Sequence, residues 1–231
     1  ETEKEKLIDL VLDIDNYPDY EGDIKGVSSM LGAMMGNGTK NQPKDSYNEE
    51  VDYMGATLFL SASGGYVSSL KRYFPRVLEM MADGLINPLF TKSDFQKEKN
   101  VALEGIKSIE KDVQTIAGRV HSKLRYGSTH PYGEFETEES LNNISLKDVQ
   151  NYYKKYAIPN NSFLTIVGDV KYEEIKPLIE SLFGKWKKGK ELNYKLPQTN
   201  NLDNIEINFV DMPNAVQSEI YVGNLMDISM T

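Results

Sequence analysis

Few side chains in this sequence could hold a metal ion or act as a nucleophile, acid or base. The chain has two histidines, His121 and His130, and no cysteine. A thiolate nucleophile, a thiolate metal site and a disulfide are therefore excluded, and imidazole chemistry would depend on these two histidines. An acidic run of Glu134, Glu136, Glu138 and Glu139 could bind a cation through its carboxylates.

Each of these features also has a structural interpretation, which we favour. His130 precedes Pro131 in a loop, and His121 lies in a helical pattern, so we expect both to be structural histidines. The acidic run is typical of a solvated loop and helix start, because carboxylates favour a helix N-terminus. One basic cluster surrounds Trp186, and we expect a solvated helix end or linker there; it consists of Lys185, Lys187, Lys188 and Lys190.

A helix predicted within residues 26–39 has one bulky face and one bare face. The bulky stripe follows the i, i+3, i+4, i+7 spacing of a core-facing helix: Val27, Met30, Leu31, Met34 and Met35. The opposite face carries Ser29, Gly32, Ala33 and Gly36. Such a face either lets a second backbone pack closely or lines a cavity, and it offers no metal ligand.

Composition limits the class of protein. The chain has 231 residues, 39% hydrophobic and 26% charged, which fits one large globular domain, or one and part of another. The net charge of -9 opposes binding to nucleic acid or anionic lipid. The sequence contains no run of 18 consecutive apolar residues, so it predicts no transmembrane helix. The sequence begins at Glu1 without an initiator Met or signal peptide, so we expect a processed piece. The lack of cysteine is compatible with the bacterial periplasm or cell envelope.

The periodicities predict strands near both ends and helices between them. The predicted strands are 7–14, 56–62, 66–69, 163–167, 205–210 and 218–222. The predicted helices include 46–54 with a capping box at its start, 70–85, 95–113, 140–156 with Ser145 as an internal cap, and 175–183. This order predicts an α+β fold of two layers, an antiparallel or mixed sheet covered on one face by helices.

Several short motifs occur in an order that resembles the pitrilysin (insulinase, M16) family of zinc metallopeptidases and their mitochondrial-processing-peptidase-like relatives. They are Gly38-Thr39, Gly55-Ala56, Asn87-Pro88-Leu-Phe90, Glu98-Lys-Asn-Val-Ala-Leu-Glu104, Tyr126-Gly127, His130-Pro-Tyr-Gly133, Glu139-Ser-Leu-Asn-Asn-Ile144, Pro159-Asn-Asn161, Val167-Gly-Asp-Val170, Phe183-Gly-Lys-Trp186 and Gln217-Ser218.

The resemblance implies a domain organisation. Residues 1–188 are expected to form an M16-like α+β lobe, residues 189–204 a linker, and residues 205–231 the truncated start of a second similar lobe. It also implies that such halves work in pairs and close a chamber around an unfolded peptide.

The same resemblance locates the family's zinc site on the bare helix face. Active members carry His-x-x-Glu-His on the helix before the Gly-Thr pair, where two histidines bind zinc and the glutamate activates water. Counted back from Gly38-Thr39, these places are Ser29, Gly32 and Ala33. The further zinc-binding glutamate aligns with Gly105, or with Glu104 if the alignment shifts by one. We therefore expect no catalytic, metal-binding or cofactor-binding residue in this chain.

The expected function is that of a non-catalytic portion of an M16 peptidase. It would pair with a zinc-bearing half and help to bind an extended peptide. Two alternatives stay open: a structural assembly subunit that handles no peptide, and an active zinc endopeptidase with unorthodox ligands. The family's Arg and Tyr that polarise the scissile carbonyl would lie beyond Thr231.

Overall fold

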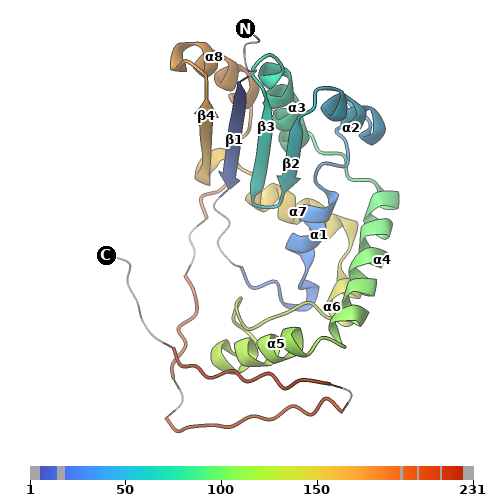
Figure 1. The fold of residues 1–231 in the computed structure, drawn as a ribbon, viewed down its shortest axis with the longest axis vertical. Coiled ribbons are helices and arrows are strands. Elements are labelled where there is room, and N and C mark those ends of the chain that lie inside the picture. Colours follow the sequence, from blue (N-terminus) through green and yellow to red (C-terminus); the bar gives the residue numbers. More distant parts are fainter. Residues whose placement is uncertain (1–5, 15–18, 193–194, 202, 214, 226–231) are drawn as a thin grey trace. The chain divides into compact units, whose positions relative to one another are not determined.

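The computed structural model describes residues 6–14, 19–192, 195–201, 203–213 and 215–225 (Figure 1). By their internal contacts the residues divide into two compact units. The first comprises residues 1–16, 27–98 and 145–192, and the second 17–26, 99–144 and 193–231.

The first unit is built on an antiparallel sheet in the order β2-β3-β1-β4. Its strands are β1 (Leu7–Ile14), β2 (Thr57–Ser61), β3 (Gly64–Leu70) and β4 (Ser162–Gly168). Its helices are α1 (Val27–Met34), α2 (Lys44–Tyr53), α3 (Phe74–Ile86), α7 (Leu146–Tyr156) and α8 (Tyr172–Phe183), with a 3-10 turn η2 (Pro159–Asn161). These elements confirm the α+β prediction.

Alternation along the strands gives the sheet one covered and one open face. In β1, Ile8, Leu10, Leu12 and Ile14 are buried, whereas the residues between them face outward. Helix α3 packs against β2 and β3 on the covered face, and α8 lies on the same side (Figure 1). On the open face, Phe59, Phe163 and Val167 are each at least 60% exposed.

The second unit contains η1 (Gly22–Ile24), α5 (Val113–Tyr126) and α6 (Glu138–Asn143), and α4 (Lys92–Ile109) crosses the boundary between the units at residue 98. Asp112 caps α5, accepting a hydrogen bond from the Thr115 backbone N–H at 2.6 Å. This cap separates α4 from α5, so the helix predicted over 95–113 ends at Ile109 and Val113 begins the next helix. Hydrogen bonds from the Ser140 hydroxyl to Lys25 O and from Asn143 to Asp23 O join α6 to the segment around η1.

Several predictions made from local pattern are wrong. The helix predicted over 70–85 begins only at Phe74, because Leu70 ends β3 and pairs with Leu7 of β1. The predicted capping box at Ser46–Glu49 does not form, because α2 begins at Lys44 and the Ser46 hydroxyl donates instead to Pro43 O at 3.0 Å. The described parts of 205–210 and 218–222 contain no β-strand. Ile205, Ile207 and Val222 are more than 90% exposed, so no neighbouring strand or helix covers these three side chains in the described chain.

Candidate functional site

Helix α1 carries the bare face that the sequence predicts. Val27, Met30, Leu31 and Met34 are buried, which confirms the core stripe. On the other side Ser29 and Ala33 are exposed and Gly32 is half-buried. A Cβ atom at Gly32 would have its nearest neighbour, the Ala62 backbone nitrogen, at 3.8 Å, an ordinary contact. This face therefore has room for larger side chains. The side chains that it carries are only the hydroxymethyl group of Ser29, the hydrogen atom of Gly32 and the methyl group of Ala33.

Gly105 and Glu104 lie on α4, in the part of that helix assigned to the second unit. Both are exposed, and nothing lies within 4 Å of a Cβ atom built at Gly105. The Glu104 carboxylate instead accepts a hydrogen bond from Lys107 Nζ at 2.7 Å, one turn further along the helix. Its structural partner is thus a surface lysine. Within the described ranges, no group of three His, Asp or Glu side chains is placed to hold a metal ion.

The turn after α1 brings two sequence motifs together. Gly38 has φ +82°, and a Cβ atom there would come within 2.6 Å of the Lys44 backbone nitrogen, so glycine is required. Thr39 is buried, and its hydroxyl accepts hydrogen bonds from the backbone N–H groups of Asn41 and Gln42. Thr39 also forms an antiparallel bridge with Pro88. The Gly-Thr and Asn-Pro motifs, distant in sequence, thus form one structural corner.

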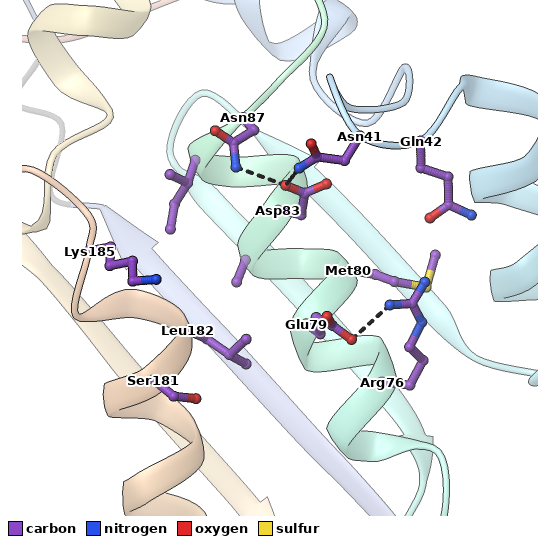
Figure 2. Close-up of a pocket in the computed structure, with 12 residues that line it drawn as sticks. Asn41, Gln42, Arg76, Glu79, Met80, Asp83, Asn87, Ser181, Leu182 and Lys185 are labelled. Atoms are coloured by element: carbon purple, nitrogen blue, oxygen red, sulfur yellow. Dashed lines mark hydrogen bonds and ion pairs between the residues drawn. The ribbon is translucent and has the colours of Figure 1, made fainter.

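A hollow of about 630 Å³ opens beside this corner, between α3, the end of α8 and the 39–42 turn. Figure 2 shows the amides of Asn41 and Asn87 meeting the carboxylate of Asp83. Asn41 Nδ2 and Asn87 Nδ2 donate to Asp83 Oδ1 at 2.6 and 2.8 Å. The sequence analysis missed this cluster, although the spacing of Asp83 and Asn87 by one helical turn is a signal for such a bond.

The charged groups on the other side of the hollow are paired with one another. The Arg76 guanidinium donates two hydrogen bonds to the Glu50 carboxylate, at 2.6 and 2.9 Å, and one to Glu79 at 2.7 Å. The hydrogen bonds from Arg76 have the largest effect on the pKa of Glu50, and a hydrogen bond from Gln42 has the next largest. Together they lower this pKa to about 2. Because these groups stabilise each other's ionised forms, we assign them to packing of α2 against α3 and not to acid–base chemistry.

Both histidines have structural neighbours. His130 is buried, its Nδ1 accepts a hydrogen bond from the Tyr132 backbone N–H at 3.0 Å, and its ring stacks on Tyr126 at 5.0 Å. The ring of His121 lies 5.0 Å from that of Tyr221, and its Nε2 is 3.5 Å from Arg125 Nη1.

The solvated-loop prediction for the acidic run is wrong at Glu134. Its side chain is only 6% exposed, and its two carboxylate oxygens accept hydrogen bonds from the backbone N–H groups of Glu21 and Gly22. Lys25 Nζ lies 3.3 Å from the same carboxylate. The burial arises because a chain segment more than 100 residues away supplies the donors. Glu138 and Glu139 are exposed in the first turn of α6, as predicted.

Comparison with known families matches the chain along most of its length. Residues 19–132 match the description insulinase (peptidase family M16), and residues 143–225 match the peptidase M16 inactive domain. The chain belongs to the M16 peptidase family. The first match includes α1 and therefore the positions Ser29, Gly32 and Ala33.

Proteins similar to this chain have different names. An uncharacterized zinc protease, YmxG, from Bacillus subtilis is 27% identical over 182 residues, which are 76% of this chain and 44% of that protein. The human mitochondrial-processing peptidase subunit beta is 24% identical, covering 69% of this chain and 34% of its own length. Rat cytochrome b-c1 complex subunit 1 is 23% identical, over 68% of this chain and 34% of that protein.

Solved structures confirm the M16 fold. A protease from Helicobacter pylori superposes with a TM-score of 0.72 at 18% identity, over 86% of this chain and 49% of that one. A peptidase M16 inactive domain from Pseudomonas fluorescens superposes with a TM-score of 0.74 at 20% identity, over 84% of this chain and 49% of that one. The chain thus spans less than half the length of these relatives. Among its described residues, no helix has the length and apolar composition needed to cross a membrane.

Proposed function

We propose that this M16 chain is a non-catalytic part of a zinc metallopeptidase, which pairs with a zinc-bearing half and helps to bind peptide substrate. One observation carries the proposal: the three places of the family's His-x-x-Glu-His motif hold Ser29, Gly32 and Ala33 on an exposed helix face. None of these side chains binds zinc in its usual coordination or acts as a general base at neutral pH. Zinc would therefore be supplied by the partner half.

The names of relatives support pairing. Two of them are described as a subunit, one of mitochondrial-processing peptidase and one of the cytochrome b-c1 complex. Since this chain covers only about a third of their length, its partner could be another chain or another part of the same protein. The exposed alternating residues Ile205 and Ile207 fit the proposal that 205–231 begins a second lobe, whose remaining strands would cover them.

Peptide handling is supported by the sheet. β2 and β4 are its edges, and each has backbone groups to which an extended peptide can add as a further strand. Phe59 and Phe163 extend from these edge strands on the open face, where apolar side chains of a bound peptide could pack. The edges and this face are the parts of the first unit that we assign to peptide contact.

The proposal is tested by zinc content and peptide cleavage. The chain is incubated with zinc, desalted and assayed with a quenched unstructured peptide, alone and mixed with an M16 half that carries His-x-x-Glu-His. We expect no retained zinc and no cleavage alone, and cleavage together with a stable complex after mixing. Near-stoichiometric zinc with chelator-sensitive cleavage by the chain alone would overturn the proposal and support unorthodox ligands.

A second function, that of an assembly subunit without peptide handling, is favoured by the similarity to cytochrome b-c1 complex subunit 1. The same mixing experiment distinguishes it. A stable complex whose cleavage rate equals that of the zinc-bearing half alone, and which does not retain an uncleavable extended peptide, would support the assembly role.

A further inference from the structure

A cluster of lysines forms a charged surface that the proposed peptidase role does not use. Lys185, Lys187, Lys188 and Lys190 follow α8, and Lys154 lies near the end of α7; all five are exposed. We call these five residues the lysine patch. We infer that the lysine patch is a docking surface for an acidic polypeptide segment of a partner protein.

The backbone that carries the lysine patch is held in place. Trp186 Nε1 donates to Ala157 O at 3.0 Å, and the Trp186 backbone N–H donates to Phe183 O at 2.9 Å. The Asn160 amide makes two hydrogen bonds with the backbone of Gly189, at 2.9 and 3.2 Å. These bonds fix residues 185–190 alongside the residues that follow α7, the helix that carries Lys154.

Inward and outward side chains are sharply divided in these segments. Tyr156, Ile158 and Trp186 are all at most 9% exposed. Gly189 lies so close to Ile158 that a Cβ atom would come within 2.6 Å of Ile158 Cγ2. The apolar side chains therefore anchor the segments in the core, and the lysines between them are left pointing outward.

The lysines of the patch are not neutralised by the chain's own carboxylates. Elsewhere, Lys6 and Lys71 share Asp169 at 3.0 Å, and Lys25 pairs with Glu134. None of the five patch lysines has a carboxylate oxygen within 4.0 Å among the residues that the structure describes, although the chain has 35 acidic residues against 26 lysines and arginines. Like charges held close together repel, so an anionic partner would be attracted to this surface.

The chemistry of the patch favours an acidic polypeptide over a membrane or a nucleic acid. Stable membrane attachment combines basic charge with an inserted apolar group, but Tyr156, Ile158 and Trp186, the apolar anchors of these segments, are buried. Single-stranded nucleic acids bind through exposed aromatic rings and arginine, whereas Trp186 is buried and the patch consists of lysine alone. Lysine contributes point charges, which suit carboxylates distributed along a flexible chain.

The test measures binding of a fluorescein-labelled glutamate-rich peptide to the whole chain by fluorescence anisotropy at about 50 and about 200 mM salt. The variant Lys185→Gln/Lys187→Gln/Lys188→Gln/Lys190→Gln removes four patch charges. The matched control, Lys40→Gln/Lys92→Gln/Lys97→Gln/Lys111→Gln, removes four exposed lysines elsewhere, so both variants have a net charge of -13 (-9 minus 4).

We expect the patch variant to bind the peptide at least about tenfold more weakly and the control to stay within about twofold of the original chain. We also expect the affinity of the original chain to fall at the higher salt concentration. Equal losses in both variants would overturn the inference, because binding would then depend on net charge. Binding to phosphatidylglycerol vesicles or to oligothymidine as tight as to the peptide would also overturn it.

Discussion

The phenol of Tyr153 on α7 donates a hydrogen bond to the carbonyl oxygen of Leu85 at the end of α3, at 2.7 Å, and lies 3.1 Å from Ile86 O. The last carbonyls of a helix have no partner within it, so this side chain satisfies acceptors that would otherwise be buried and unpaired. The bond joins residues 68 positions apart and fixes α7 to the corner that contains Thr39 and Pro88.

Tyr153→Phe should destabilise the first unit by about 1–3 kcal/mol, because it leaves the Leu85 carbonyl without this donor. The free energy of unfolding, measured with urea, would report the loss. Tyr53→Phe is the matched control, since Tyr53 is 82% exposed, and we expect it to change stability by less than about 0.5 kcal/mol. Equal effects in the two variants would contradict the proposed bond.

Stability should also respond to alkaline pH through Tyr153. Burial raises the pKa of its phenol from 10.0 to about 12 in the folded chain. The folded state holds the proton more tightly than the unfolded state, so this contribution is complete below about pH 10 and is lost as the pH rises toward 12. The stability difference between the original chain and Tyr153→Phe should therefore shrink between these pH values. A difference that stays constant there would contradict the assignment.

Two glycines within helices should respond in opposite directions to alanine. A Cβ atom at Gly84 in α3 would lie 2.6 Å from Leu60 Cδ1 and 3.0 Å from the Tyr47 hydroxyl, which donates to Met80 O. Gly84→Ala should therefore cost about 1–3 kcal/mol through overpacking. At Gly105 in α4 a Cβ atom meets nothing within 4 Å, so Gly105→Ala should stabilise the chain by about 0.5–1 kcal/mol. Thermal and urea unfolding of both variants would check the signs.

Restoring the family's ligands on α1 should create zinc binding. The variant Ser29→His/Gly32→Glu/Ala33→His puts two imidazoles one helical turn apart on an exposed face with room for them. After incubation with zinc and desalting, we expect the variant to retain more zinc than the original chain but less than one ion per chain, because the family's third zinc ligand is still absent at Gly105. Ala33→His alone, with a single ligand, should retain much less. Zinc retained equally by the original chain would show that another site exists.

Local patterns in the sequence predicted several features correctly. The spacing of Val77, Met81 and Leu85 identified the buried face of α3, and all three are fully buried. Ser145 was predicted to cap a helix, and it forms a capping box with Asp148 at the start of α7. The bare face of α1 could likewise be recognised from residues within two helical turns. Such features depend on neighbours a few positions away, whose spacing the sequence states directly.

Only the tertiary structure decided which distant residues meet. The sequence alone did not show that Thr39 pairs with Pro88, that Tyr153 satisfies Leu85, or that Glu134 is buried by the backbone of Glu21 and Gly22. It also predicted strands at 205–210 and 218–222 from alternating side chains, but a strand exists only where another strand accepts its hydrogen bonds. Local periodicity determines what a segment can become, and the packing of distant segments determines whether it has a partner.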